Sequence, residues 1–170
     1  MVIKRILKRK LLLLGFLALI LTANAQNSNY ITNHKAIALV LAHTYGIPAP
    51  LILAVATIES SGGNGPAAKV LNNHFGIEGE NDFVTQRGFR SRYKQYPNVY
   101  ASYIDFCEMI SRKKFYKKLK NNTNCGAWVK AMAAAHYSEM PEEWEHKILG
   151  MIAGIKSQAK KEPLQLLAIN

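Results

Sequence analysis

The chain has 170 residues, and its 22 lysines and arginines against 11 aspartates and glutamates give a formal net charge of +11. Such an excess of positive charge favours a polyanionic partner. The two cysteines, Cys107 and Cys125, are too few for a zinc site unless histidines contribute, and the five histidines form no cluster with ligand spacing. We therefore expect no metal.

The first 25 residues have the pattern of a secretory signal peptide. Residues 1–10 carry five basic side chains and no acidic one, residues 11–21 are apolar apart from Gly15, and Ala23-Asn24-Ala25 is typical of a cleavage site. The alternative is an uncleaved anchor, but this apolar run is much shorter than the roughly twenty residues that span a bilayer. We predict that Gln26 begins the mature protein and that no membrane span remains.

Removal of residues 1–25 would leave 145 residues with 17 basic and 11 acidic side chains. That length suits one domain with its own core. Export to the periplasm or the outer cell envelope makes the anionic envelope a better partner than nucleic acid. In such an oxidising compartment Cys107 and Cys125 can pair, and the sequence leaves open whether they do.

Most of the mature chain is predicted to be helical. Residues 33–45 place apolar side chains on one face and stop at Gly46, and Pro50 suits the first turn of the next helix, 51–60. A short helix is expected at 66–71. Asn98 can cap a helix that begins at 99, and a further helix covers 126–136. Pro141 begins the last helix, which has acidic side chains in its first turn and an apolar stripe of Trp144, Ile148, Met151, Ile152 and Ile155.

Residues 72–97 differ from the rest because glycines and prolines separate short β-prone pieces at 82–86 and 88–93. We predict a small, irregular β-hairpin there. The expected fold is therefore α+β and mostly helical, a lysozyme-like domain over residues 26–160 with a small β-hairpin lobe and the active site in the cleft between the lobes. Residues 161–170 are expected to form a C-terminal tail.

Glu59 is the strongest candidate for a catalytic side chain. On the predicted helix it shares a face with Ile52, Val55 and Ala56, and a glycine-rich break follows at 61–65. Apolar surroundings raise the pKa of a carboxyl group, and an acid that stays protonated near neutral pH can protonate a leaving glycosidic oxygen. The alternative is that Glu59 ends its helix and points to water.

Several motifs, in order, resemble the glucosaminidase family of peptidoglycan hydrolases (glycoside hydrolase family 73, flagellar-type β-N-acetylglucosaminidases). Over about residues 30–157 they are Ala56-Thr57-Ile58-Glu59-Ser60, Asn72-Asn73-His74-Phe75-Gly76-Ile77, Phe89-Arg90 with Tyr93, Ser102-Tyr103-Ile104-Asp105-Phe106, and Trp128 with residues 131–137. Several ordered motifs are far more specific than one.

This resemblance implies an endo-β-N-acetylglucosaminidase that cleaves β-1,4 bonds in the N-acetylglucosamine–N-acetylmuramic acid strands of peptidoglycan, without a metal or organic cofactor. Glu59 would be the general acid. Tyr137 matches a tyrosine that lines the sugar site, and it is a second candidate catalytic residue, which could stabilise the oxocarbenium-like state opposite Glu59. Asn73 and Phe75 match the turn that walls the cleft and are candidates for substrate binding. Each of these three residues also has a purely structural interpretation, as a packing or turn residue.

The chain departs from the family pattern where a second catalytic group is expected. The candidates for a carboxylate opposite Glu59 are Glu78, Glu80 and Asp82, none of them in a diagnostic motif. Separations of roughly 5 Å allow a covalent nucleophile and roughly 6.5–9.5 Å leave room for water, while a substrate acetamido group can replace the second carboxylate. His136 stands where the family has glycine, so it either alters the cleft or is a surface residue.

Two other functions fit the same residues. A lytic transglycosylase would act on the same polymer and leave anhydro-sugar ends. A catalytically weak peptidoglycan-binding protein would instead assist the assembly of an envelope-spanning machine, with a protein partner in the envelope.

Overall fold

The structure, a computed structural model, describes residues 26–82 and 91–161. Helix α2 (Ala49–Glu59) lies at its centre, and residues 51–57 of this helix are all buried. Because α2 is apolar on every side, it needs neighbours on every side. It packs against α7 (Cys125–Ala134) and α8 (Pro141–Lys161), which also pack against each other.

The other helices begin and end largely where the sequence signals stand. The first helix is helical over the described residues 26–45, so it begins before the predicted start at 33. As predicted, it ends at Gly46, whose φ of +64° suits glycine. Helix α3 covers Pro66–Leu71, α5 covers Val99–Ser111 and α6 covers Tyr116–Leu119. The Asn98 side chain accepts a hydrogen bond from the Ala101 amide at 2.9 Å, as predicted for the cap of α5.

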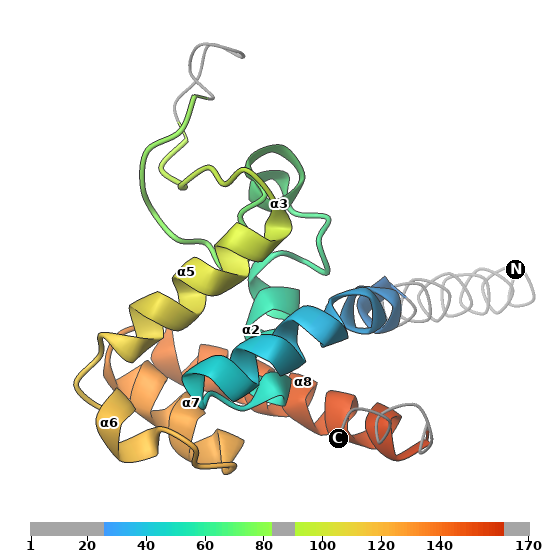
Figure 1. Ribbon diagram of the computed structural model, residues 1–170, viewed down its shortest axis with the longest axis vertical. Helices are drawn as coiled ribbons and strands as arrows, with labels where there is room; N and C mark the ends of the chain where they lie inside the picture. Colours follow the sequence, from blue (N-terminus) through green and yellow to red (C-terminus); the bar gives the residue numbers. More distant parts are fainter. Residues whose placement is uncertain (1–25, 83–90, 162–170) are drawn as a thin grey trace, which may run out of the picture.

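The helices form two regions that α5 connects (Figure 1). Helix α3 and the segments 72–82 and 91–97 lie at one end of the molecule, and α6, α7 and α8 lie at the other. Helix α2, which ends at Glu59, lies between them.

The predicted β-hairpin is not confirmed. In the described ranges, segments 72–82 and 91–97 contain only an isolated bridge between Glu78 and Tyr93, supported by backbone hydrogen bonds such as Lys94 N to Ile77 O at 2.8 Å. The Asn81 amide adds bonds to the Ser91 and Tyr93 carbonyls, so a side chain supplies contacts that a strand ladder would make. Residues 83–90, which hold most of the predicted strands, lie outside the described ranges.

Cys107 and Cys125 are both buried, and they are not bonded to each other. Within residues 26–82 and 91–161, no helix has the length and apolar character needed to cross a membrane. The predicted signal peptide lies outside the described residues, as does the predicted tail beyond Lys161, where α8 ends. The domain boundaries at 26 and 160 stay predictions.

Candidate active site

A cleft of about 730 Å³ opens beside the end of α2. The turn after α3, the end of α5, the connection from α7 to α8 and the first turns of α8 form its walls. It therefore lies between the two regions of the fold. The side chains and backbone that line it are those of Ile58, Glu59, Phe75, Gly76, Ile77, Glu78, Arg92, Tyr93, Met109, Lys113, His136, Tyr137, Ser138, Glu139, Met140, Glu143, Trp144 and Lys147.

Glu59 is exposed to solvent along this cleft, and one of its oxygens is fixed in place. The buried indole of Trp144 donates a hydrogen bond of 2.7 Å from Nε1 to Glu59 Oε1. Desolvation by the surrounding protein raises the pKa of the Glu59 carboxyl, while the Trp144 bond and the charge of Lys147 act in the opposite direction. The raised pKa favours the protonated form that a general acid needs.

The second oxygen of Glu59 faces a gap left by a glycine. A methyl group at Gly76 would lie 3.8 Å from Glu59 Oε2 and 3.9 Å from the Tyr93 ring, so a longer side chain would enter the space between them. Gly76 also has a φ of +66°, a conformation that side chains disfavour. Glycine at this position therefore keeps Oε2 accessible to a ligand.

Aromatic side chains form the wall beside Glu59. The Tyr137 ring lies 5.0 Å from the Trp144 ring, and the Tyr137 hydroxyl donates a 3.2 Å hydrogen bond to the carbonyl of Phe75. Phe75 is buried and stacks on Phe106 at 4.2 Å. Desolvation, followed by the charge of Glu59, raises the pKa of the Tyr137 hydroxyl well above its usual range, so it stays protonated and donates.

Asn73 does not line the cleft; it holds the turn that does. Its side chain is buried, and the amide nitrogen donates to the carbonyls of Ile77 and Lys94, each at 2.8 Å. Its oxygen accepts from the backbone amides of Phe75 and Ile77 at 3.3 and 3.2 Å. These four hydrogen bonds occupy both donor hydrogens and the acceptor oxygen of the Asn73 side chain within the protein.

The structure separates the three acidic residues considered as partners of Glu59. Glu78 lines the cleft, where an exposed ion pair of 3.3 Å joins it to Arg92. Glu80 and Asp82 line a different, smaller pocket of about 260 Å³ with Asn81, Gln95, Tyr96 and Pro97, and neither of them lines the cleft. His136 lines the cleft, is exposed and lies just after α7. Its φ of +52° is one that glycine, the residue of the family pattern, adopts most readily.

Several lining residues were not identified as site residues from the sequence. Trp144 was assigned only to the buried face of the last helix, and Tyr93 only to a motif. Glu139 and Glu143 are two further carboxylates in the cleft, and Lys147 forms a 2.6 Å ion pair with Glu143. The acidic first turn of α8 was noted as a helix signal, and no pattern within that turn links it to Glu59.

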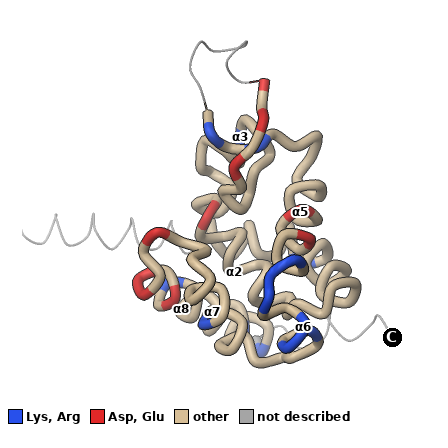
Figure 2. Tube along the Cα trace, turned by 90° about the vertical axis from the view of Figure 1, so that its left-hand side faces the viewer, with Lys and Arg blue, Asp and Glu red and all other residues tan. Residues whose placement is uncertain are grey.

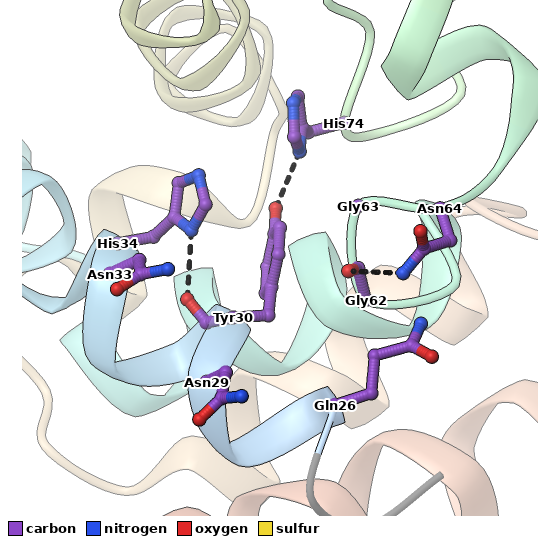
Figure 3. A pocket seen from close by; sticks show the side chains of 9 residues that line it. All are labelled: Gln26, Asn29, Tyr30, Asn33, His34, Gly62, Gly63, Asn64 and His74. Carbon is purple, nitrogen blue, oxygen red and sulfur yellow. Dashed lines mark hydrogen bonds between the residues drawn. The ribbon is translucent and has the colours of Figure 1, made fainter. Parts of the chain in front are cut away.

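A second pocket, of about 570 Å³, lies between the first helix and the turn that follows Glu59 (Figure 3). Asparagine, glutamine, histidine and tyrosine side chains line it, together with Gly62 and Gly63, and no carboxylate does. It therefore has no candidate general acid. In the described ranges, no three histidine, cysteine or acidic residues lie close enough to hold a metal ion.

Two residues that line the second pocket, Tyr30 and His74, nevertheless hold the wall of the cleft in place. The Tyr30 hydroxyl lies 2.6 Å from His74 Nδ1 and 2.9 Å from the Tyr103 hydroxyl, and the His74 backbone amide donates to Ser102 Oγ at 3.0 Å. Burial, and then the charge of His34, lowers the pKa of His74 to about 4, so its ring is neutral at neutral pH. This network fixes the residue that precedes Phe75.

Comparison with known proteins shows the family and the fold of this chain. The sequence model of the glucosaminidase family, described as mannosyl-glycoprotein endo-beta-N-acetylglucosaminidase, matches residues 35–157. No protein in a search of curated sequences matches the chain.

Solved structures show the same fold at low sequence identity. The glycoside hydrolase domain of FlgJ from Salmonella typhimurium is 19% identical, with 79% of this chain and 91% of that chain covered and a TM-score of 0.60. The catalytic domain of the autolysin Auto from Listeria monocytogenes is 18% identical, with 77% and 85% covered and a TM-score of 0.63. A peptidoglycan hydrolase mutant from Sphingomonas sp. A1 is 17% identical, with 78% and 98% covered and a TM-score of 0.61. The predicted mostly helical, lysozyme-like fold is thereby confirmed.

Proposed function

Because this chain belongs to the glucosaminidase family and is a glycoside hydrolase, we propose that it cleaves the β-1,4 glycosidic bonds of peptidoglycan strands as an endo-β-N-acetylglucosaminidase. Its substrate would be the polymer of N-acetylglucosamine and N-acetylmuramic acid. The proposal includes export to the cell envelope, where that polymer is found, by the signal peptide predicted at residues 1–25.

The observation that carries the proposal is the state of the Glu59 carboxyl. Trp144 fixes Oε1, Oε2 faces the open cleft beside Gly76, and desolvation raises the carboxyl pKa. A protonated acid held in this orientation can transfer its proton to the oxygen of the sugar that leaves. General acid catalysis by one positioned side chain typically contributes about 10²–10⁴-fold to the rate.

The positive charge that develops on the cleaved sugar needs a partner opposite Glu59. Three other carboxylates share the cleft: Glu78, Glu139 and Glu143. Glu78 forms an ion pair with Arg92, and Glu143 forms one with Lys147. The acetamido group of the substrate can also stabilise this charge, and it needs no protein carboxylate. Tyr137 contributes by holding the Phe75 carbonyl and contacting the Trp144 ring, so we assign it a positioning role.

The test compares the wild type with Glu59→Gln on purified sacculi, with Glu80→Gln as the control. Both variants remove one carboxylate, but Glu80 is exposed and lies outside the cleft. We expect Glu59→Gln to lose at least about 100-fold in turnover with an unchanged unfolding midpoint, and Glu80→Gln to keep wild-type turnover. A Glu59→Gln variant with wild-type activity would refute the assignment.

Mass spectrometry of the wild-type digest defines the reaction. Reducing N-acetylglucosamine ends support the proposed hydrolysis, whereas 1,6-anhydromuramic ends identify a lytic transglycosylase. Binding to sacculi without the release of fragments identifies a binding protein that assists an envelope assembly.

A further inference from the structure

A dense group of positive charges lies between α5 and α7. Six of the nine residues from 112 to 120 are basic and all six are exposed; we call them the basic platform: Arg112, Lys113, Lys114, Lys117, Lys118 and Lys120. Figure 2 shows them along α6 and the segment before it, whereas acidic residues gather at the start of α8. The platform thus gives one part of the surface a strong positive potential.

Buried contacts hold the platform in place. The Tyr116 hydroxyl donates a 2.6 Å hydrogen bond to the Tyr45 carbonyl, and Leu119 is buried. The Phe115 ring packs edge-on against the Trp128 ring, with 6.3 Å between their centroids. The backbone amide of Asn121 donates a hydrogen bond of 2.9 Å to the Gly46 carbonyl. Residues with inward contacts therefore alternate with exposed lysines, and those contacts fix the backbone that presents the charges.

Among the residues that the structure describes, no acidic side chain forms an ion pair with the lysines of the platform. Across residues 26–82 and 91–160, Arg112 is the platform residue that forms ion pairs, at 3.9 Å with Asp105 and with Glu108. No ion pair in these ranges involves the other five. Packed lysines repel one another unless an anion binds, so the folded protein maintains an unpaired site for negative charge.

The platform is continuous with the cleft. Lys113 belongs to both, and it lines the cleft together with Met109 of α5. A polymer that occupies the cleft and leaves it past Lys113 meets Lys114 and then the lysines of α6. On the other wall of the cleft, Glu139 and Glu143 would repel the same anionic groups.

We propose that the basic platform binds the carboxylates of the peptide stems that peptidoglycan strands carry, so that the protein prefers peptide-bearing strands to bare glycan. This inference rests on the proposed function. The sugar backbone of a peptide-bearing strand is neutral, and its negative charges lie on the stems, which project from the strand toward the rim of a cleft that holds it. Exposed lysines at that rim match flexible carboxylates, because an ammonium group binds as a point charge without a fixed geometry.

The test uses two substrates. One is peptide-bearing strands; the other is the same strands after an amidase has removed the peptides and the lactyl carboxylates that this hydrolysis frees have been converted to amides, so that the bare strand is neutral. The variant K114E/K117E/K118E leaves the cleft residue Lys113 in place. The control K69E/K130E/K160E makes the same change in net charge at exposed lysines of α3, α7 and α8, none of which lines the cleft. For the platform variant we expect KM on peptide-bearing strands to rise by about tenfold, since each exposed charge pair contributes modestly.

On peptide-free strands the platform variant should keep the wild-type KM within about twofold, because these strands have no stem carboxylates for the platform lysines to bind. The control should match the wild type on both substrates. For the wild type, increasing salt should raise KM on peptide-bearing strands only, since salt screens exposed charges; this measurement needs no variant. Chemical amidation of the stem carboxylates should have the same effect as the platform variant.

The inference is overturned if the wild type shows equal KM and equal salt dependence on the two substrates. It is also overturned if the platform variant loses affinity for both substrates alike, which would indicate a general attraction to polyanions. Failure of the wild type to cleave either substrate would refute the proposed function instead, so the two failures are distinguishable.

Discussion

Replacement of Asn73 by alanine tests whether this residue stabilises the turn or binds the substrate. The side chain is 1% exposed and makes four hydrogen bonds to the backbone of residues 75, 77 and 94. A buried hydrogen bond contributes about 1 kcal/mol net, and the two amide donors at 3.2 and 3.3 Å are the longer pair. We therefore expect a loss of roughly 3 kcal/mol in the free energy of unfolding.

In a domain of this size, 1 kcal/mol corresponds to about 2–4 °C, so thermal unfolding followed by circular dichroism should show a midpoint lower by about 6–12 °C. Asn72→Gly is the matched control. Asn72 makes one side-chain bond, to the Tyr96 carbonyl, and its φ of +52° is one that glycine adopts without strain. We expect this control to lose about 1 kcal/mol or less. If Asn73→Ala has the same unfolding midpoint as the control while its KM for glycan rises severalfold, Asn73 binds substrate and the structural interpretation is wrong.

Two further predictions concern the carboxyl of Glu59 and the buried thiols. Trp144→Phe removes the indole donor that lowers the Glu59 pKa, so the alkaline limb of the pH–activity profile, where the acid loses its proton, should move to higher pH; a limb at lower pH would contradict this sign. Burial raises the pKa of the Cys107 thiol to about 12, and both cysteines are free, so a thiol reagent should titrate neither in the native protein and both after unfolding without reductant. Two thiols that stay unreactive after unfolding would indicate a disulfide.

Helix positions were predictable because their signals are local. Gly46 ends the first helix, Pro50 lies in the first turn of α2, Asn98 caps α5 and Pro141 begins α8, each as the sequence indicates. The face of α2 was less predictable. Its apolar residues suggested one buried stripe, whereas residues 51–57 are buried on all sides because the helix lies at the centre of the fold.

Segments 72–82 and 91–97 were harder to predict because side chains make several of the hydrogen bonds that join them. Asn73 and Asn81 donate to four backbone carbonyls, those of Ile77, Lys94, Ser91 and Tyr93, and the Ile77 carbonyl also accepts from the Lys94 backbone amide. Propensity patterns register β-prone residues but not these individual bonds. The sequence therefore identified an irregular segment beside the cleft, and the prediction of a hairpin there was not confirmed.

The same limit explains why Trp144 was not identified as a partner of Glu59. The periodicity of the last helix correctly places Trp144 on a buried face with Ile148, Ile152 and Ile155. Burial of a tryptophan also requires an acceptor for its N–H group, and periodicity does not say which one. Trp128, the other tryptophan, donates to the backbone carbonyl of Asn122 at 2.9 Å, a purely structural solution.

Trp144 instead donates to a carboxylate 85 residues earlier in the chain. This pairing costs the fold nothing in hydrogen bonds, because the indole would need an acceptor in any case. It also orients the proposed acid, since fixing Oε1 leaves Oε2 as the oxygen that can deliver a proton into the cleft. The packing of α2 against α8 therefore does two things at once: it buries the core and it sets the direction of the proposed proton transfer.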